Sequence, residues 1–228
     1  MEQRFTQEQH LLHKLVLHCN DTPVQGLMDG KMGILLVLSE YTRFRKLKPL
    51  KTAIGFLLEQ ITNNLSKEMS LEFDNGLTGI GWGIEYLLQN KFQRGFGADI
   101  CAEIDQKLMS QNILRQTCLN LDKGIEGWLH YIIAHQQGAQ SQKRNVFDAT
   151  YLQDCSDMCK RLVQQDIPHS LRQLCLMFIA MSQGKSIKYI MNLASFINPT
   201  TKRNTQLLGL RNGIAGLLFT TIINKQNS

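Results

Sequence analysis

Proline is scarce in this chain, with only four residues among 228. Because proline removes a backbone hydrogen-bond donor and breaks helix interiors, its scarcity leaves room for long helices. The sequence has no uninterrupted apolar run of about 18 residues or more, which excludes a hydrophobic membrane-spanning helix. Its first residues, Met1–Phe5, lack the apolar core of a secretory signal. These absences predict a soluble, cytoplasmic protein, which we interpret as one domain over residues 1–228.

Charge is also limited, since 19% of residues are charged and the formal net charge is +6. Together with 43% hydrophobic residues, this low charged fraction excludes a disordered chain and permits a sizeable core. The densest basic group, Arg43–Lys48, has no accompanying base-reading motif, although it could contact nucleic acid. We interpret it as a solvated turn, and we predict neither nucleic acid nor a membrane as a partner.

The cysteines and histidines form no clear metal-binding pattern. Cys155 and Cys159 share one helical face and could contribute two metal ligands, but they also suit two apolar core positions. His130 and His135 are five residues apart and do not share a helical face. We therefore predict no metal and no cofactor, and we expect six free thiols in a reducing compartment: Cys19, Cys101, Cys118, Cys155, Cys159 and Cys175.

A Gly-x-x-Gly pattern recurs four times, each time followed by a strongly apolar stretch. Its first glycines are separated by 46, 48 and 89 residues, and they are Gly30, Gly76, Gly124 and Gly213. The last interval is close to two periods, which predicts a degenerate copy near His169 without the glycines. Five copies of about 45 residues then fill the chain.

Each copy has the pattern of a helix pair. The apolar residues before each glycine motif follow the spacing of a single-faced helix, as in Ile54, Leu57, Leu58 and Ile61. The stretch after each motif is apolar on all sides, which is typical of a buried inner helix. Strand-like alternation is absent, so we predict an all-α fold with repeats over residues 5–46, 50–92, 98–138, 149–183 and 185–225. The last repeat is expected to begin with an outer helix that contains Ile187, Ile190, Met191, Ala194 and Ile197.

The inner-helix starts resemble those of the lanthionine synthetase C-like (LanC-like) family. The resemblance rests on Asn75–Trp82, Lys123–Trp128 and Arg211–Leu217 and extends over about residues 8 to 224. It implies an α/α toroid, in which inner helices line a central cavity. Members of the family typically have more helix pairs than five. An open ring would expose apolar faces at both ends, which favours a homodimer or a partner that supplies the missing pairs.

The resemblance does not extend to the zinc site of the family's cyclases. Those enzymes bind zinc through two cysteines and a histidine, the last two in a Cys-His-Gly segment, and the zinc activates a substrate thiol. Here Arg211 and Asn212 precede the corresponding Gly213, and neither residue can replace those ligands. The sequence thus predicts a member of the family without the cyclase zinc site.

Residues near the inner-helix starts are the candidates for ligand binding. Acidic residues there could act on a substrate or simply cap a helix, and basic residues would add to the positive ends of the helix dipoles. The two tryptophans could form the floor of a groove or belong to the core. The candidates are Asp29, Lys31, Asp74, Trp82, Glu85, Lys123, Trp128 and Arg211.

These patterns favour a protein that binds a peptide or protein partner, with an acidic partner suggested by the basic candidates. We expect it to act in a peptide-modification or maturation system rather than as an enzyme. The alternative is an enzyme of the α/α-toroid type: a divergent lanthionine cyclase, or a carbohydrate-active enzyme that uses cavity carboxylates. A purely structural repeat scaffold is a third hypothesis.

Overall fold

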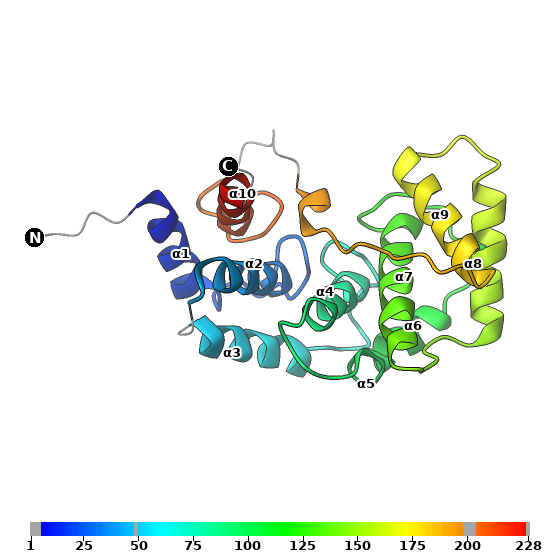
Figure 1. Ribbon diagram of the computed structural model, residues 1–228, viewed down its shortest axis with the longest axis horizontal. Helices are drawn as coiled ribbons and strands as arrows, with labels where there is room; N and C mark the ends of the chain where they lie inside the picture. The colour runs from blue at the N-terminus through cyan, green and yellow to red at the C-terminus, as the bar shows by residue number, and fades with distance from the viewer. Residues whose placement is uncertain (1–5, 48–49, 198–203, 227–228) are drawn as a thin grey trace, which may run out of the picture. The chain divides into compact units, whose positions relative to one another are not determined.

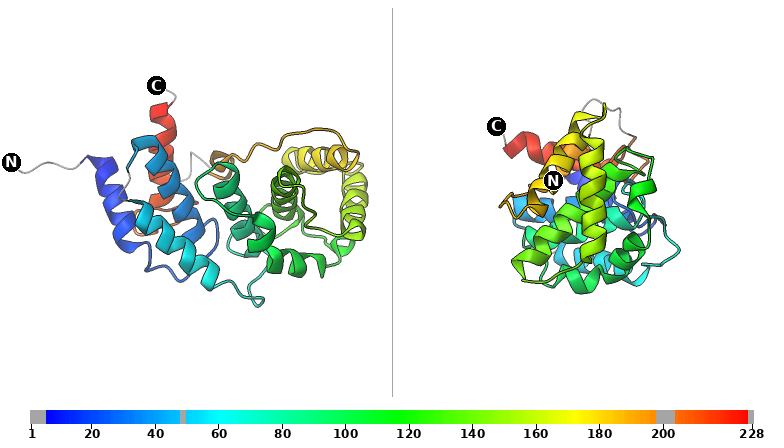
Figure 2. Two further views of the ribbon diagram at one scale, coloured as in Figure 1. Left: turned by 60° about the horizontal axis from the view of Figure 1, so that its bottom comes forward. Right: turned by 90° about the vertical axis from the view of Figure 1, so that its right-hand side faces the viewer.

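A computed structural model describes residues 6–47, 50–197 and 204–226, and all regular structure within these ranges is helical (Figures 1 and 2). The all-α prediction is therefore confirmed for the described part of the chain. None of the described helices is both long and apolar enough to cross a bilayer. Lys48, the last residue of the predicted basic turn, and Met1–Phe5 lie outside the described residues.

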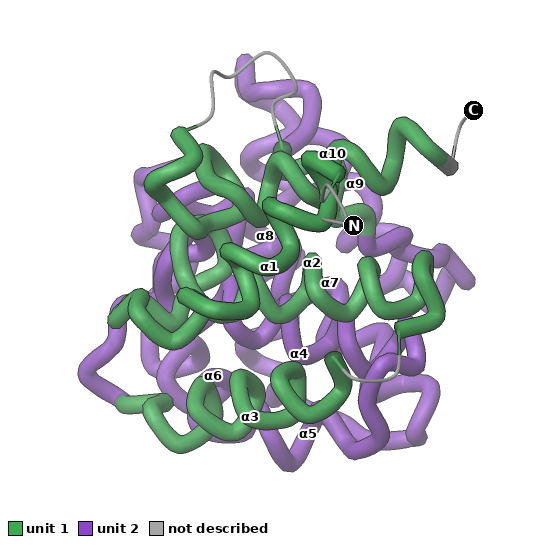
Figure 3. Tube along the Cα trace, turned by 90° about the vertical axis from the view of Figure 1, so that its left-hand side faces the viewer, with its two compact units in different colours: residues 1–66, 192–228 green, residues 67–191 purple. Residues whose placement is uncertain are grey.

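The chain divides into two compact units, which Figure 3 distinguishes by colour. Unit 1 comprises residues 1–66 and 192–228. In it, α2 packs against α3 and α10, and α1 packs against α10. A capping box at Thr6 begins α1, because Thr6 and Gln9 bond reciprocally to each other's backbone amides. The helices of unit 1 are α1 (Gln7–His18), α2 (Lys31–Arg45), α3 (Leu50–Asn63), η2 (Leu193–Phe196) and α10 (Ile214–Gln226).

Unit 2 is continuous, from residue 67 to residue 191. Its central helix is α7, which packs against α4, α5 and α9, while α8 covers α9. The core includes Trp82, Tyr131 and Phe178, all of which are fully buried. The helices of unit 2 are α4 (Leu77–Gln89), α5 (Gly97–Ile100), α6 (Ala102–Met109), η1 (Ile113–Arg115), α7 (Ile125–Ser141), α8 (Ala149–Leu162) and α9 (His169–Ser182). The predicted repeat 50–92 thus contributes α3 to unit 1 and α4 to unit 2.

The loops that precede α2, α4, α7 and α10 have the same hydrogen-bonding pattern. In each loop, the amide after the first glycine donates to the carbonyl seven residues earlier, at 2.8–2.9 Å; the pairs are Lys31–Val24, Leu77–Ser70, Ile125–Cys118 and Ile214–Leu207. The helix begins at that residue in all four cases. A Cβ atom on Gly76 or Gly124 would overlap backbone atoms of its own loop, so the turn requires glycine there.

The loops also contact each other in pairs, and the two pairs use equivalent positions. In unit 2, the amides of Phe73 and Asp74 donate to the carbonyl of Asp122. In unit 1, the amides of Leu210 and Arg211 donate to the carbonyl of Met28. Counted from the first glycine of each copy, the donors are at positions −3 and −2 and the acceptor is at −2 in both pairs. The second copy therefore contacts the third in the same way that the last copy contacts the first.

The helix ends repeat as well. After α2, α4 and α7, a lysine adopts the left-handed conformation, with φ of 55° at Lys46, 62° at Lys91 and 55° at Lys143. After α9, Gly184 takes this position with φ of 75°. In each case the next amide donates back to a carbonyl five residues earlier, as in a Schellman motif. The shared ending groups α9 with α2, α4 and α7, which supports the predicted degenerate copy near His169.

The outer helix predicted for the last repeat is wrong. Residues 185–192 have no helical structure, and within the span of the predicted outer helix only the short 3-10 helix η2 is helical (Figure 2). The Gln137 side chain explains the extended backbone, because it accepts from the amide of Tyr189 at 2.7 Å and donates to its carbonyl at 3.0 Å. The buried Tyr189 hydroxyl accepts from Trp82 Nε1 at 3.1 Å and lies 2.6 Å from His130 Nδ1. Ile190, predicted to face the core, is 74% exposed.

Candidate functional site

Unit 1 contains a cavity of about 700 Å³ at the junction of α1 with the loops before α2 and α10. This volume lies within the range of roughly 300–1,000 Å³ that is usual for small-ligand sites. Its walls come from one face of α1, from the segment after α1, from the residue before Gly30 and from the loop before α10. The lining residues are Lys14, His18, Asp21, Thr22, Asp29, Gln206, Leu207, Leu208, Gly209 and Gly213.

Two polar contacts organise the α1 side of this cavity. Lys14 Nζ donates to the Thr205 carbonyl at 2.9 Å, which ties α1 to the loop before α10. His18 Nδ1 lies 2.6 Å from Asp21 Oδ2, and both side chains remain accessible to solvent. Leu207 lines the cavity and is 50% exposed. The cavity therefore offers charges of both signs and an exposed apolar side chain.

The opposite wall depends on the close approach of two loops. The Met28 carbonyl accepts from the amides of Leu210 and Arg211 at 2.7 and 3.0 Å. A Cβ atom on Gly209 would lie 2.7 Å from Asp29 Cα, so this approach requires glycine at position 209. The local sequence thus positions Asp29 and Gly209 beside each other in the wall.

Of the candidates in unit 1, only Asp29 is among the lining residues of the cavity. Lys31 is 7% exposed, and its ammonium donates to Gln60 Oε1 on α3 at 2.8 Å. Arg211 is partly buried, and its backbone belongs to the contact with Met28. Lys31 therefore stabilises the packing of α2 on α3 and does not face a ligand site.

In unit 2, Asp74 and the two tryptophans are buried, and Lys123 lies on the surface. Lys123 Nζ pairs with Glu72 Oε1 at 3.0 Å, which raises the pKa of Lys123. Trp128 is 5% exposed and donates from Nε1 to the Leu71 carbonyl at 2.9 Å; Trp82 is fully buried. Asp74 is 8% exposed, and its carboxylate accepts from the Asn75 amide at 2.7 Å. Neither indole forms the floor of a surface groove, and both belong to the core.

Glu85 lies in a buried charged cluster that joins α4, α6 and α7. Its Oε1 is 2.8 Å from Nδ1 of His135, while Nε2 of His135 is 2.8 Å from Asp105 Oδ2. Tyr131 donates from its hydroxyl to the other oxygen of Asp105 at 2.5 Å, and Gln89 donates to Glu85 Oε2 at 2.7 Å. Glu85, Asp105 and His135 are at most 3% exposed, so no substrate can reach them in this structure.

The protonation of His135 follows from this environment. Burial alone lowers the pKa of the imidazole, because it disfavours the charged form. The hydrogen bonds and negative charges of Asp105 and Glu85 outweigh burial and raise the pKa to about 9. The imidazolium then bridges two carboxylates at neutral pH. For His130, burial dominates and lowers the pKa to about 4.

Asp105 and His135 were not predicted as partners of Glu85. Glu85 was noticeable as a carboxylate in an apolar run, and His135 follows Ile132, Ile133 and Ala134 in another. Two ionisable residues of opposite sign in two apolar helices are a usable signal, because a buried charge needs a partner. Asp105 occurs in a polar stretch of sequence, and only the packing of α6 shows that its carboxylate is buried against His135.

Among the described residues, neither the cysteines nor the possible metal ligands form a second candidate site. Cys155 and Cys159 are buried on α8, as expected for core positions, and burial raises the pKa of Cys155 to about 12. Cys118 is partly exposed, and all six cysteines are free. Within residues 6–47, 50–197 and 204–226, no group of three or more His, Cys, Asp or Glu side chains has an arrangement that could hold a metal ion.

Comparisons of the chain with protein-family models, with curated proteins and with solved structures each give no match.

Proposed function

We propose that the protein is a LanC-like helical-repeat protein without the cyclase zinc site, and that it binds a segment of a peptide or protein partner in the unit 1 cavity. The observation that carries this proposal is the cavity itself, which has the volume and the mixed polarity of a ligand site. Association with a peptide-modification or maturation system rests on the family resemblance alone.

The repeated loop contacts join neighbouring copies within each unit. In unit 2, the pair formed by Phe73 and Asp122 joins the second copy to the third, and in unit 1 the pair formed by Leu210 and Met28 joins the last copy to the first. A second glycine also contributes in both cases: a Cβ atom on Gly33 would lie 3.0 Å from Leu210 Cβ, and one on Gly127 would overlap Phe73.

The cavity lies at the junction between the last and first copies, and its walls suit a peptide segment. A peptide carries amide donors, carbonyl acceptors and side chains of both signs. Lys14 and His18 offer cations or donors, Asp21 and Asp29 offer carboxylates, and Leu207 offers apolar contact. Because the walls carry two basic and two acidic side chains, they favour a polar or zwitterionic segment over a polyanion.

An enzyme remains a weaker hypothesis. The cavity contains the carboxylates of Asp21 and Asp29, as a carbohydrate-active toroid would require. However, the Asp21 side chain is 65% exposed and bonded to His18, whereas a glycosidase acid is held in an environment that keeps it protonated. The buried pair of Glu85 and Asp105 is closed to substrate and neutralised in part by His135.

A peptide-display selection tests the proposal. The full chain would be used to select from a library of random 12-residue peptides, and the Kd of an enriched peptide would be measured by fluorescence anisotropy. Thr22→Trp places a large side chain at the cavity wall, so we expect it to weaken binding at least about tenfold, which corresponds to about 1.4 kcal/mol.

The matched control is Thr52→Trp, which adds the same side chain to the exposed face of α3 in the same unit. It should leave the Kd within about twofold of the wild-type value. If the selection enriches no peptide, or if both variants bind equally well, the cavity is not a peptide site. Cleavage of a labelled oligosaccharide that depends on Asp21 and Asp29 would favour the enzyme instead.

A further inference from the structure

Two segments of unit 2, residues 91–100 after α4 and residues 143–145 after α7, lie together on its surface. Arg144 links them, because its guanidinium is 2.5 Å from Asp99 Oδ1 and lies over the Phe96 ring at 4.9 Å from the centroid. The contact is on the surface, since the Asp99 side chain is 62% exposed and that of Arg144 is 41% exposed. Neither segment contributes to the unit 1 cavity.

Apolar and basic side chains are concentrated at this contact. Phe96 is 51% exposed and Ile100 is 38% exposed, although both are large hydrophobic residues. A Cβ atom on Gly95 would lie 3.5 Å from Ile100 Cδ1, which places the turn before Phe96 against Ile100. We call the following set the basic–apolar patch: Lys91, Arg94, Phe96, Ile100, Lys143 and Arg144.

Most of the cations in this patch have no acidic neighbour. Lys91, Arg94 and Lys143 are exposed, and no carboxylate of the described residues lies within ion-pair distance of them. Arg144 is the exception, because it pairs with Asp99. Arg94 lies two residues before Phe96 and Lys143 precedes Arg144, so these cations belong to the two segments that Arg144 joins. Among the described residues, no carboxylate neutralises Lys91, Arg94 or Lys143.

The backbone of the patch is fixed. Lys91 and Lys143 occupy left-handed positions at the ends of α4 and α7, and the amides that follow them bond back to Leu87 and Ala139 at 2.8 and 3.0 Å. The stacked Arg144 and Phe96 also lose little freedom when a partner covers them. Aromatic residues and arginine are enriched in protein interfaces, partly for this reason.

We propose that the basic–apolar patch binds an acidic segment of a partner protein, with carboxylates that pair with Lys91, Arg94 and Lys143 and an apolar side chain that covers Phe96 and Ile100. The chemistry of the patch favours this partner over an anionic lipid surface. The exposed Asp99 carboxylate would be repelled by the negative membrane surface, and the Arg144 guanidinium, which lies over one face of the Phe96 ring, opposes insertion of that ring into lipid. A protein segment can instead place an apolar side chain on the exposed parts of Phe96 and Ile100 while its carboxylates reach the neighbouring cations.

The test uses a fluorescein-labelled 12-residue peptide made of four repeats of Glu-Asp-Phe. A second peptide, with lysine in place of both acidic residues, provides the charge-reversed probe. We expect the full chain to bind the acidic probe and not the basic one. The double variant Arg94→Glu/Lys143→Glu should weaken binding of the acidic probe at least about tenfold, and Phe96→Ser should weaken it by about fivefold.

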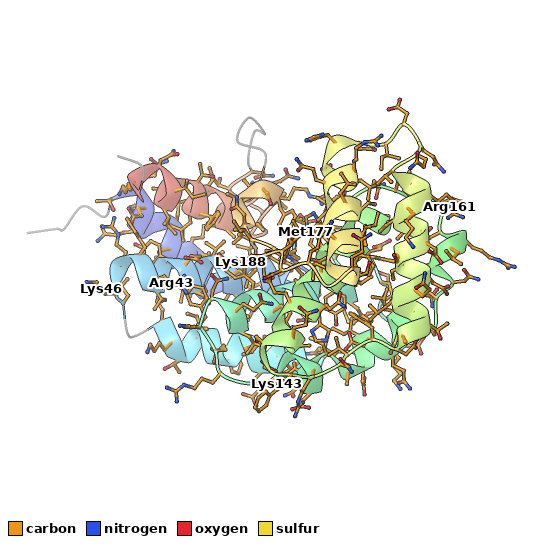
Figure 4. All side chains as sticks on the ribbon, turned by 45° about the vertical axis from the view of Figure 1, so that its right-hand side comes forward. Arg43, Lys46, Lys143, Arg161, Met177 and Lys188 are labelled. Atoms are coloured by element: carbon orange, nitrogen blue, oxygen red, sulfur yellow. The ribbon has the colours of Figure 1, made fainter. Side chains whose placement is uncertain are left out.

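Matched controls separate this patch from the general positive charge of the protein. Lys185→Glu/Lys188→Glu makes the same charge change at exposed positions after α9, and Figure 4 shows Lys188 and Lys143 on different parts of the surface. Leu176→Ser removes another half-exposed apolar side chain. Both controls should retain the wild-type Kd within about twofold. All four variants are at exposed positions, and circular dichroism verifies that they fold.

Two results would overturn the proposal. Equal weakening by the control pair and the patch pair would mean that the acidic probe senses only net charge. Binding of phosphatidylserine-containing vesicles that Arg94→Glu/Lys143→Glu abolishes, without binding of the acidic probe, would identify the patch as a membrane contact. The unit 1 cavity is not altered by any of these variants, so either proposal can fail alone.

Discussion

The charged bridge formed by Glu85, His135 and Asp105 gives the clearest prediction. Replacement of His135 by glutamine keeps a hydrogen-bond donor but removes the positive charge between two buried carboxylates. The pKa of His135 is about 9 in the folded protein and about 6.5 in an unfolded chain, a difference that corresponds to roughly 3 kcal/mol of stability. Because the folded pKa is the higher one, this contribution is complete below about pH 6.5 and is lost as the pH rises through 9.

Urea unfolding at several pH values between 6 and 10 measures the effect. Both tryptophans of the chain, Trp82 and Trp128, belong to unit 2, so tryptophan fluorescence reports on the unit that contains the bridge. At pH 6, His135→Gln should lower the free energy of unfolding by about 3 kcal/mol, a typical cost of breaking a buried ion pair. By pH 10 the difference from the wild type should shrink below about 1 kcal/mol, since His135 is then neutral in both states.

The control is His169→Gln, at an exposed histidine on α9 that bonds to Gln173. It should unfold like the wild type over the whole pH range. A loss of stability in His135→Gln that stays constant from pH 6 to pH 10 would refute the reasoning, because it would show that the imidazolium charge is not what the two carboxylates require.

Three further predictions concern stability. On the acid side, burial lowers the pKa of His130 to about 4, so stability should fall as the pH drops from about 6.5 towards 4, and His130→Asn should reduce this fall in the same urea titration. Lys91 and Gly184 both have left-handed backbones, which favour glycine. Lys91→Gly should therefore raise the free energy of unfolding by up to about 1 kcal/mol, whereas Gly184→Ala should lower it by about 1 kcal/mol. Circular dichroism should show opposite shifts of the thermal midpoint in the two variants. Gly81→Ala should lower the free energy of unfolding by about 2 kcal/mol, because its Cβ would overlap the Tyr131 ring. Gly55→Ala on α3, where a Cβ meets nothing within 4 Å, should raise it by up to about 1 kcal/mol. Equal shifts in the two variants would contradict the close approach of α4 and α7.

The sequence was most informative where local chemistry determines the structure. The glycine motifs predicted where α2, α4, α7 and α10 begin, because the first glycine closes a turn that a side chain would block. The helix pattern failed for residues 187–197, where the apolar spacing was helical but the Gln137 side chain holds the backbone of Tyr189 extended. That contact spans more than 50 positions in sequence, and periodicity cannot detect it.

The candidate site was less predictable for a similar reason. Asp29 was selected as a residue near a helix start, and it does line the cavity. Lys14 and His18 were not selected, because they belong to an ordinary amphipathic helix and reach the cavity only through the packing of α1 beside α10. Lys31 was selected for its charge, but its ammonium donates a hydrogen bond to Gln60, which is 29 residues away in sequence, and the side chain is buried.

The discontinuity of unit 1 has a consequence for synthesis on the ribosome. Residues 67–191 form unit 2 without a break, so this unit can complete its core while the remainder is still being translated. The first 66 residues can pack α2 against α3, but they cannot complete unit 1, because α1 and α2 also pack against α10, which is translated after the whole of unit 2. Until α10 emerges, the surfaces of α1 and α2 that contact it lack their native cover, so exposed apolar surface on the nascent chain is expected to be greatest during this interval.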